Sequence, residues 1–395
     1  MQSFPAGILT INGGSSSIKF SVYGTGHELR RLLQGKIERI GLSDPLLRYT
    51  DTDTGQPVQC RIEAADLQGA ASFLVSWLEQ KKILAGIKAI GHRVVHGLEH
   101  VEPALITEQL LKELHRISAY DPDHLPGEIA LMELFREKYP QLPQVACFDT
   151  AFHADLPRIA RLLPIPRRYD EAGIRRYGFH GLSYSYILGE LEHIAGKKAA
   201  EGRVIIAHLG SGASLAAVHK GKCVDTSMGF TPAGGLMMGS RPGDLDPGVA
   251  WYMIQKDDLT PSQFNELINH QCGLVGVSGT SGDMRDLLQQ ENDDVRAAEA
   301  VQLFCYQVKK WIGAFSAVLE GIDTLVFTGG IGENLAIIRS RICQGLGYLD
   351  MALDEKKNEK NDLIISSGNS RITVYVIPTD EEKMIAKITS FYGNV

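Results

Sequence analysis

The sequence predicts an α/β protein built from two domains that share one strand–turn–strand motif. The chain has 395 residues, more than one compact core usually holds, and this length suits two domains. The stretch ILTINGGSSSIKF (residues 8–20) places a Gly-Ser turn between two apolar runs, and VIIAHLGSGASLAAV (204–218) repeats the arrangement. Strand and helix patterns are mixed after both stretches. Such a repeat indicates a duplicated domain with a cleft between the two copies.

The composition is typical of a soluble globular protein, with 44% apolar and 22% charged residues. The formal net charge of -7 argues against a nucleic-acid partner. No apolar run approaches the roughly 18 residues that span a bilayer, and no basic segment opens the chain, so we expect neither a membrane span nor a secretion signal. The six cysteines are scattered without a C-x-x-C pair, which argues against a zinc site or a disulfide framework and favours a reducing cytosol.

The first half of the chain combines strands and helices. ILTIN and IKFSVY flank the first turn as strands, and TEQLLKELHRIS (107–118) spaces its leucines and Ile117 along one helix face. QVACFD (144–149) reads as a short buried strand that ends on an acid.

The second half opens with the strand RVIIAHLG and the hairpin ASLAAVHKGKCVD, which has Lys-Gly at its tip. A long helix is expected from about residue 294 to 319, and 324–342 read as strand, glycine-rich turn and helix. The last segment, ITVYVIPTDEEKMIAKITSFY, predicts a strand and a helix that Thr379 begins in a capping box with Glu382.

The two Gly-Ser turns allow two interpretations. Backbone N–H groups in glycine-rich turns form anion-binding nests, so two facing turns would hold a polyphosphate from both sides. Both turns also fit plain tight hairpins. The chain has no G-x-x-x-x-G-K-[ST], H-R-D or D-F-G motif, which excludes a P-loop enzyme and a protein kinase. GGIGEN (329–334) lacks the spacing of a dinucleotide fingerprint, and we expect it to let a base or ribose approach the backbone.

Four polar residues lie in segments that are otherwise apolar or glycine-rich: Arg93 in GHRVVHG, Asp149 in CFDTAFH, His180 in RRYGFHG and Arg241 in the loop 226–248. Taken singly, each has a structural explanation. An arginine in a strand usually pairs with a carboxylate or extends to solvent, and a histidine near aromatic rings is usually a hydrogen-bonded core residue. Asp246 before Pro247 predicts only a helix N-cap.

Taken together, these segments resemble the acetate kinase family, and the likeness covers nearly the whole chain in the family's order. The matching stretches are INGGSSSIKF, GHRVVHG, FDTAFH, RRYGFHG, HLGSGAS, DTSMGFTP, GLMMGSRPGDLDPG, GVSGTSGDMRDL, GGIGEN and IPTDEE. The resemblance implies a duplicated α/β fold of the actin and hexokinase (ribonuclease-H-like) type with a nucleotide cleft between the domains. We expect an N-terminal domain over residues 1–150, joined by the C-terminal helix 383–395, and a nucleotide-binding domain over 151–382.

The implied reaction is reversible, direct in-line phosphoryl transfer between ATP and acetate, which gives ADP and acetyl phosphate, with propionate also accepted. The resemblance also implies Mg²⁺ as cofactor, with Mn²⁺ as a substitute, and a cytoplasmic homodimer. The expected partners are a short-chain carboxylate and a nucleotide, with no nucleic acid and no membrane.

The resemblance assigns catalytic roles at matching positions. Arg93 and Arg241 would hold the carboxylate and the transferring phosphoryl group, because a planar guanidinium suits both. His180 would donate a hydrogen bond to an equatorial oxygen in the transition state. Asp149 matches the family's essential acid. A carboxylate nucleophile has no proton to lose, so we expect Asp149 to orient Arg93, or water around Mg²⁺, rather than to act as a base.

The remaining positions would contact ligands. Asn12 and Glu381 would hold Mg²⁺, directly or through water, although Glu381 also fits a first-turn acid that favours the helix dipole. The acyl pocket would be lined by Val95, Ala119, Phe179 and Pro232. The phosphate path would be lined by Ser15, Ser17 and Lys19. The nucleotide would contact His208, Leu209, Gly210, Ser211, Gly212, Asp283, Met284, Arg285, Gly330, Ile331, Gly332, Glu333 and Asn334.

Four positions depart from the family pattern. Ser211 replaces a usual Asn, and Tyr120 and Tyr184 stand where His is common, with Tyr184 expected outside first contact. Ala119 replaces a larger Leu, which leaves room for one or two methylenes, so we expect propionate to compete well with acetate. Two alternatives are a propionate or butyrate kinase and a non-catalytic, actin-like nucleotide-binding protein. A protein that only binds a nucleotide would not need both Arg93 and Arg241, which argues against the non-catalytic alternative.

Overall fold

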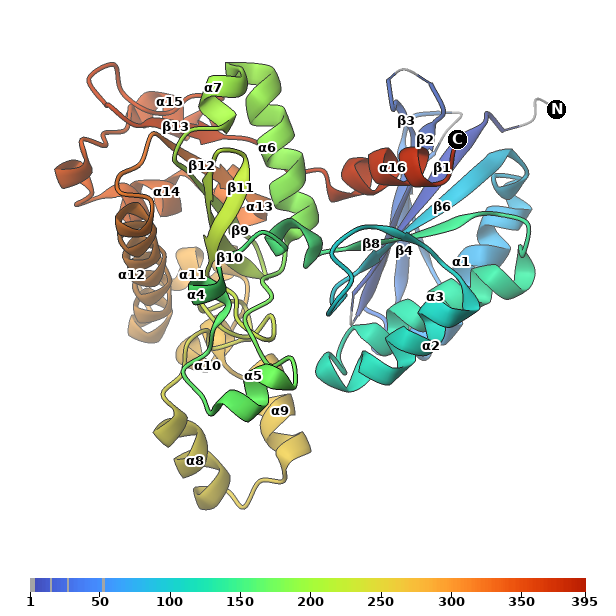
Figure 1. The fold of residues 1–395 in the computed structure, drawn as a ribbon, viewed down its shortest axis with the longest axis horizontal. Helices are drawn as coiled ribbons and strands as arrows, with labels where there is room; N and C mark the ends of the chain where they lie inside the picture. The colour runs from blue at the N-terminus through green and yellow to red at the C-terminus, as the bar shows by residue number, and fades with distance from the viewer. Residues whose placement is uncertain (1–3, 15, 27, 52–53) are drawn as a thin grey trace. The chain divides into compact units, whose positions relative to one another are not determined.

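The computed structural model describes residues 4–14, 16–26, 28–51 and 54–395. Two compact units form, of which unit 1 comprises Met1–Ala151 and Asp380–Val395, and unit 2 comprises Phe152–Thr379 (Figure 1). Each unit contains one mixed β-sheet with helices, so the predicted α/β class is confirmed. Within the described residues, no helix is both long and apolar enough to cross a membrane.

Unit 1 is built on an eight-stranded sheet with the strand order β5-β4-β3-β2-β1-β6-β8-β7. The strands are β1 (Gly7–Gly13), β2 (Ser17–Gly24), β3 (Arg31–Glu38), β4 (Leu46–Thr50), β5 (Pro57–Arg61), β6 (Ile87–Val94), β7 (Ala104–Leu105) and β8 (Gln144–Phe148). Strands β1 to β5 form an antiparallel meander, whereas β1, β6 and β8 run parallel. The carboxyl ends of β1, β6 and β8 therefore lie next to one another.

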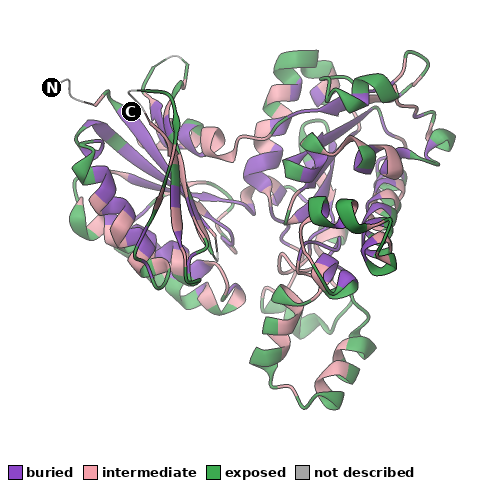
Figure 2. Ribbon diagram, turned by 180° about the vertical axis from the view of Figure 1, so that it is seen from behind, coloured by how far each residue is buried: buried purple, intermediate pink, exposed green. Residues whose placement is uncertain are grey.

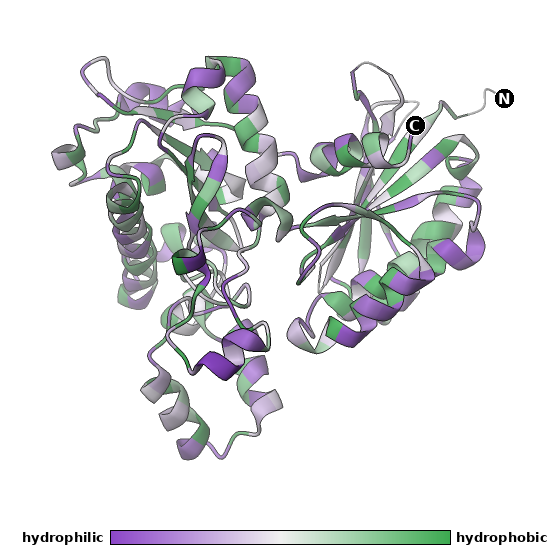
Figure 3. Ribbon diagram, viewed as in Figure 1, coloured by the Kyte–Doolittle hydropathy of each residue, from purple (hydrophilic) through white to green (hydrophobic). Residues whose placement is uncertain are grey.

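The helices of unit 1 are α1 (Leu67–Gln80), α2 (Glu108–Ile117), α3 (Leu125–Lys138) and α16 (Glu381–Tyr392). Leu9 and Ile11 of β1 pack in the main core with α1 and α3 residues, whereas Ile8 packs with Ala386 of α16. Because side chains alternate along a strand, α16 covers the opposite face. Gly91 lets α16 approach β6 closely, since a Cβ there would lie 2.1 Å from Oγ1 of Thr389. Hydrophilic and hydrophobic residues alternate along α2 and α3 (Figure 3).

Unit 2 is built on a five-stranded sheet with the order β11-β10-β9-β12-β13. The strands are β9 (Val204–Leu209), β10 (Ala213–His219), β11 (Lys222–Thr226), β12 (Thr324–Thr328) and β13 (Thr373–Val376). The helices are α4 (Arg158–Arg161), α5 (Arg167–Glu171), α6 (Gly181–Ala195), α7 (Lys197–Ala200), α8 (Pro247–Lys256), α9 (Pro261–His270), α10 (Gly273–Ser278), α11 (Met284–Gln290), α12 (Val295–Val318), α13 (Gly329–Asn334), α14 (Ala336–Cys343) and α15 (Glu355–Glu359). Buried residues concentrate in the strands of both sheets (Figure 2).

The two sheets share one topology, which confirms the duplication that the two Gly-Ser turns predict. In unit 1, the antiparallel strands β3, β2 and β1 are followed by the parallel strands β6 and β8. In unit 2, β11, β10 and β9 are followed by β12 and β13 with the same directions. The first turn and the second turn are both tight hairpins, with Gly14 N donating to Ser17 O (2.7 Å) and Gly210 N donating to Gly212 O (3.0 Å).

Two local predictions are wrong. Asp380, not Thr379, caps α16, because the Asp380 side chain accepts from Lys383 N (2.9 Å), so the predicted capping box is absent. GGIGEN is not a turn but forms the short helix α13, which starts at Gly329 with φ 76°. Asp246 caps α8 as predicted, and its carboxylate accepts from Gly248 N (2.6 Å).

Candidate active site

The carboxyl ends of the parallel strands of unit 1 bring three predicted residues together. Asn12 lies near the end of β1, Arg93 near the end of β6, and Asp149 directly after β8. Asp149 N donates to Val94 O (2.9 Å), which continues the β6–β8 pairing past the end of β8. Glu381 begins α16 on the same face as Asn12.

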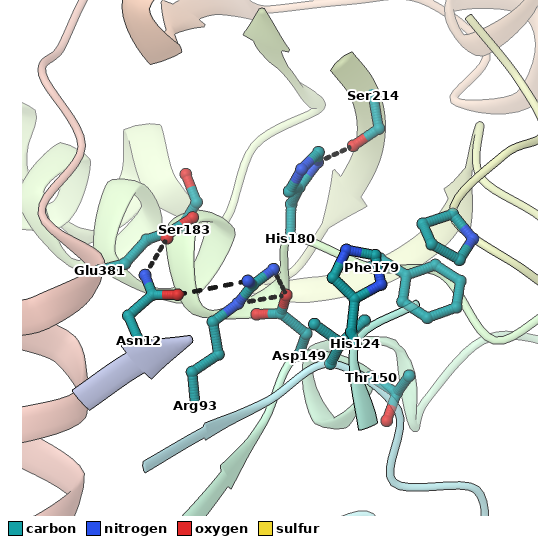
Figure 4. Close-up of polar contacts among 12 residues, drawn as sticks. Asn12, Arg93, His124, Asp149, Thr150, Phe179, His180, Ser183, Ser214 and Glu381 are labelled. Carbon is teal, nitrogen blue, oxygen red and sulfur yellow. Dashed lines mark hydrogen bonds and ion pairs between the residues drawn. The ribbon is translucent and has the colours of Figure 1, made fainter. Parts of the chain in front are cut away.

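Arg93 is the centre of this cluster. Its Nε and Nη2 both donate to Oδ2 of Asp149 (3.0 and 2.5 Å), and its Nη1 donates to Oδ1 of Asn12 (3.3 Å; Figure 4). The Arg93 side chain is 15% exposed and Asp149 is fully buried. Burial alone would lower the pKa of Arg93, but the carboxylates of Asp149, Glu381 and Glu128 raise it above its ordinary value. Arg93 is therefore a fixed cation with a fixed orientation.

The side-chain amide of Asn12 connects this cluster to α16. Its Nδ2 donates to Oε2 of Glu381 (3.2 Å) and to Oε1 of Glu382 (3.3 Å). The two carboxylates thus supply oxygen atoms of the kind that Mg²⁺ prefers, whereas the Asn12 amide oxygen accepts from Arg93. These residues fit a magnesium site in the chemistry of their donors. No larger group of His, Cys, Asp and Glu that suits a metal ion occurs among the described residues.

The predicted phosphate-path residues belong to the first hairpin. Lys19 is exposed on β2 and lies directly opposite Asn12 in the β1–β2 register. Ser17 is the first residue of β2 and is half-buried. The predicted contact Ser15 lies outside the described residues.

A buried carboxyl group that the sequence analysis missed lies beside Arg93. Glu128 in the first turn of α3 is 3% exposed, and its Oε2 accepts from Val95 N (3.0 Å). Its Oε1 is buried and has no hydrogen-bond partner among the described residues. Burial raises the pKa of Glu128 well above its usual range, against the opposing effect of Arg93. The signal was present in the sequence, since Glu128 lies beside Leu125, Ile129 and Met132 in an apolar helix face.

We expect Glu128→Gln to change the pH dependence of stability. A carboxyl with a raised native pKa stabilises the fold below its unfolded pKa of about 4.3, and this contribution is lost as the pH rises through the native pKa. The variant cannot ionise, so its free energy of unfolding should exceed that of wild type increasingly from pH 5 to pH 8. The difference should grow by at most about 1.4 kcal/mol per pH unit. Urea unfolding at both pH values measures it.

The exposed Glu137 of α3 supplies the matched control. Glu137→Gln should leave the pH profile of stability unchanged, because this side chain is in contact with water in the folded and the unfolded protein. Parallel profiles for wild type and Glu128→Gln would rule out a buried, neutral Glu128.

A second missed group is the pair Asp121 and His124 at the start of α3. His124 Nδ1 lies 2.8 Å from Oδ1 of Asp121, which is buried. A carboxylate at Nδ1 fixes the imidazole orientation and leaves Nε2 for a ligand. His124 is drawn with the Arg93 cluster in Figure 4.

In unit 2, His180 precedes α6 with a left-handed backbone (φ 59°). Its Nδ1 lies 2.8 Å from Oγ of Ser214 (Figure 4), and Ser214 also bonds the hydroxyl of the buried Tyr184. The ring of His180 stacks on that of His208, with centroids 4.3 Å apart. Tyr184 thus holds His180 through Ser214.

Gly212 allows three predicted residues of unit 2 to meet. A Cβ at Gly212 would lie 3.0 Å from Nη2 of Arg241 and 3.2 Å from Nε2 of His180, so only glycine fits without displacing them. Arg241 Nη1 also donates to the carbonyl of Pro232 (2.7 Å). The second Gly-Ser turn therefore packs directly on a guanidinium and an imidazole.

The predicted nucleotide residues of unit 2 form neighbouring segments. A Cβ at Gly329 would lie 2.7 Å from Leu209 O, so α13 begins against the end of β9. Oε1 of Glu333 accepts from Gly329 N (2.8 Å) and from Thr379 N (3.0 Å). The Thr379 hydroxyl lies 2.8 Å from the Ser183 hydroxyl, so it is engaged away from α16. Ser211 O accepts from Gly239 N (3.0 Å).

The segment 283–285 joins the same region. A Cβ at Gly282 would lie 2.8 Å from Gly239 O, which brings this segment beside the loop that contacts Ser211. Asp283 caps α11 and pairs with Arg285, with Nη2 2.6 Å from Oδ2, and Met284 is buried.

The predicted acyl-pocket residues divide between the units. Val95 in unit 1 is buried, and Ala119 is exposed in the 3-10 turn Ser118–Tyr120. Phe179 in unit 2 is buried, and Pro232 is half-buried beside Arg241.

Comparison with known proteins defines the class. The profile of the Acetokinase family matches residues 7–387. The chain is 41% identical over 387 residues to an acetate kinase of Rhodopseudomonas palustris, covering 96% of both chains. It is 42% identical over 389 residues to the propionate kinase PduW of Salmonella typhimurium, covering 96% of this chain and 95% of the relative. The crystal structure of a propionate kinase from Francisella tularensis matches with a TM-score of 0.90 and 35% identity, covering 97% and 98% of the two chains.

These matches define a phosphotransferase whose acceptor is a carboxyl group. The chain belongs to the acetokinase family.

Proposed function

We propose that this protein transfers a phosphoryl group reversibly between ATP and acetate, giving ADP and acetyl phosphate, and that it also accepts propionate. The observation that carries the proposal is the Arg93 cluster. A largely buried arginine held by Asp149 and Asn12 offers a guanidinium of fixed orientation beside the carboxyl ends of three parallel strands. A guanidinium binds a carboxylate in a planar, charge-assisted geometry.

Unit 2 supplies the groups suited to the nucleotide and to transition-state charge. Arg241 and His180 meet at Gly212, beside the turn of residues 208–212. When Tyr184 donates to Ser214 and Ser214 donates to Nδ1 of His180, the proton of the imidazole lies on Nε2. His180 then donates to an equatorial oxygen of the transferring group while Arg241 neutralises its charge.

Asn12 and Glu381 are the proposed magnesium residues, and Glu382 adds a carboxylate to them. A Mg²⁺ ion held by these residues would supply positive charge that offsets the charge of the phosphate groups. Asp149 is proposed to orient Arg93. A carboxylate nucleophile needs no base, and both Asp149 contacts to Arg93 use the oxygen Oδ2.

The alternative is a nucleotide-binding protein without transfer activity. Hydroxylamine traps an acyl phosphate as a hydroxamate. Wild type with ATP, Mg²⁺ and acetate should therefore form hydroxamate, and Arg241→Ala should not. A wild-type protein that binds ATP but yields no hydroxamate with acetate, propionate or butyrate would support the alternative.

The choice between acids is proposed to depend on Ala119. Ala119→Leu adds about three carbons to the pocket wall and should lower kcat/KM for propionate relative to acetate by about 10–200-fold. The exposed Ala195 at the end of α6 gives the control, and Ala195→Leu should leave the ratio unchanged. An unchanged ratio in Ala119→Leu would remove this residue from the pocket.

We extend the proposal to a cytoplasmic homodimer. The six cysteines are free, as expected in a reducing compartment. The helices α8 and α9 have no buried residue, and α8 exposes Val249, Trp251 and Tyr252. An exposed apolar cluster of this kind suits a subunit interface. Sedimentation should give about twice the chain mass of 43.3 kDa, and a mass equal to one chain would contradict it.

A further inference from the structure

A groove of about 690 Å³ lies over strands β2 to β5 of unit 1. Its charged lining residues are the cations Lys19, Arg31, Lys36 and Arg48 and the carboxylate Glu382. The strand register places three of the cations in one row. Lys19 of β2 lies directly opposite Lys36 of β3, Lys36 lies opposite Arg48 of β4, and Arg48 lies opposite Gln59 of β5. Directly opposed residues share a face of the sheet, so three cations stand side by side. Asn12 lies opposite Lys19, so this row begins at the Arg93 cluster.

Without a bound anion, this row of cations destabilises the pairing of β2, β3 and β4. Like charges on directly opposed residues destabilise a strand pair. Lysines often protect a sheet edge from pairing with another chain. That explanation fails here because β5 is the edge strand, whereas Lys19, Lys36 and Arg48 lie on inner strands.

The nearby acids neutralise the row only in part. Glu38 lies 3.0 Å from Lys36 Nζ and 3.1 Å from Arg48 Nη1, so one carboxylate serves two cations. Lys36 and Arg48 remain 42% and 55% exposed. Lys19 makes no ion pair within the described part of the chain and is exposed.

We propose that this groove, which adjoins the Arg93 cluster, binds a linear multivalent anion with at least two linked phosphates. Neighbouring strands are about 4.8 Å apart, so the row offers cations over about 10 Å. One orthophosphate is too short to contact all three, whereas a diphosphate or longer chain reaches them. Gln34, Gln59 and Thr50 line the same groove with amide and hydroxyl groups for further hydrogen bonds.

The ligand has two possible sources with the same chemistry, a free polyphosphate or the phosphate chain of a nucleotide. The proposal does not depend on acyl kinase activity, because the test measures binding without turnover. Titration calorimetry of the full chain with pyrophosphate, orthophosphate and ADP distinguishes these sources.

The variant Lys36→Gln/Arg48→Gln removes two exposed cations of the row. We expect the double variant to lose one pyrophosphate site per chain, or to weaken it at least tenfold. The control Lys112→Gln/Arg116→Gln removes two exposed cations of α2, on the opposite face of the sheet, and should bind as wild type does. If the double variant binds both ADP and pyrophosphate more weakly than wild type does, the groove binds nucleotide phosphates. If only pyrophosphate binding weakens, the groove binds free polyphosphate.

Glu38→Gln should have the opposite effect on pyrophosphate binding to that of Lys36→Gln/Arg48→Gln. Removing the carboxylate that neutralises Lys36 and Arg48 should tighten pyrophosphate binding. A purely structural role of the row predicts no tighter binding. Equal isotherms for wild type and Lys36→Gln/Arg48→Gln, or equal losses in that variant and its control, would overturn the proposal.

Discussion

Arg93→Gln should lower kcat/KM for acyl phosphate formation by about 10³–10⁵-fold, the range for removing an arginine that stabilises phosphoryl transfer. Glutamine is neutral and cannot offer the paired donors of a guanidinium. Arg93 is the cation that Asp149 and Asn12 hold in place, so no neighbouring side chain replaces it. Steady-state rates with acetate and with propionate measure the loss.

A matched pair elsewhere in the chain controls for the loss of an arginine. Arg203 and Asp323 have the same shortest contact as Arg93 and Asp149, 2.5 Å, but are exposed by 34% and 48%. Arg203→Gln should leave kcat/KM within about twofold of wild type, since exposed ion pairs contribute little. An Arg93→Gln enzyme with near-normal kcat/KM would exclude Arg93 from acceptor binding.

Asp149→Asn should lower the free energy of unfolding by about 3 kcal/mol or more, because it leaves the largely buried Arg93 without its carboxylate. It should also lower kcat, since Arg93 loses the group that orients it. The pH dependence of kcat should keep its shape, because no proton leaves a carboxylate nucleophile. Urea unfolding and rate profiles measure the two effects.

The double variant Arg93→Gln/Asp149→Asn separates stability from function. It contains no unpaired buried charge, so it should lose less stability than the sum of the single variants, with a coupling of at least about 1 kcal/mol. Its activity should remain as low as that of Arg93→Gln. Additive stability losses would show that the two side chains do not interact in solution.

The fold was largely predictable because the informative patterns are local. The repeated Gly-Ser turns at residues 13–17 and 209–213 predicted the duplication, and both sheets have the same strand order. The helix start at residue 380 was not predictable from spacing. Thr379 and Asp380 are both good N-caps, and the Thr379 hydroxyl is engaged by Ser183, which is 196 residues away in the chain.

The candidate site was only partly predictable. Resemblance named Arg93, Asp149 and Asn12, and unit 1 brings them within hydrogen-bond distance. Glu128 and Glu382 were missed because their importance arises from tertiary contacts with Val95 N and Asn12. A charged residue in the apolar face of α3 was the only signal for Glu128.

The central claim is that an oxygen of the acceptor carboxylate forms the new bond to phosphorus. Phosphorus NMR of the wild-type reaction with ATP, Mg²⁺ and acetate labelled with ¹⁸O in both carboxyl oxygens tests it most directly. The account predicts an acetyl phosphate resonance shifted upfield by one bridging ¹⁸O. A folded, nucleotide-binding protein that gives no such resonance, or one without the isotope shift, would contradict it.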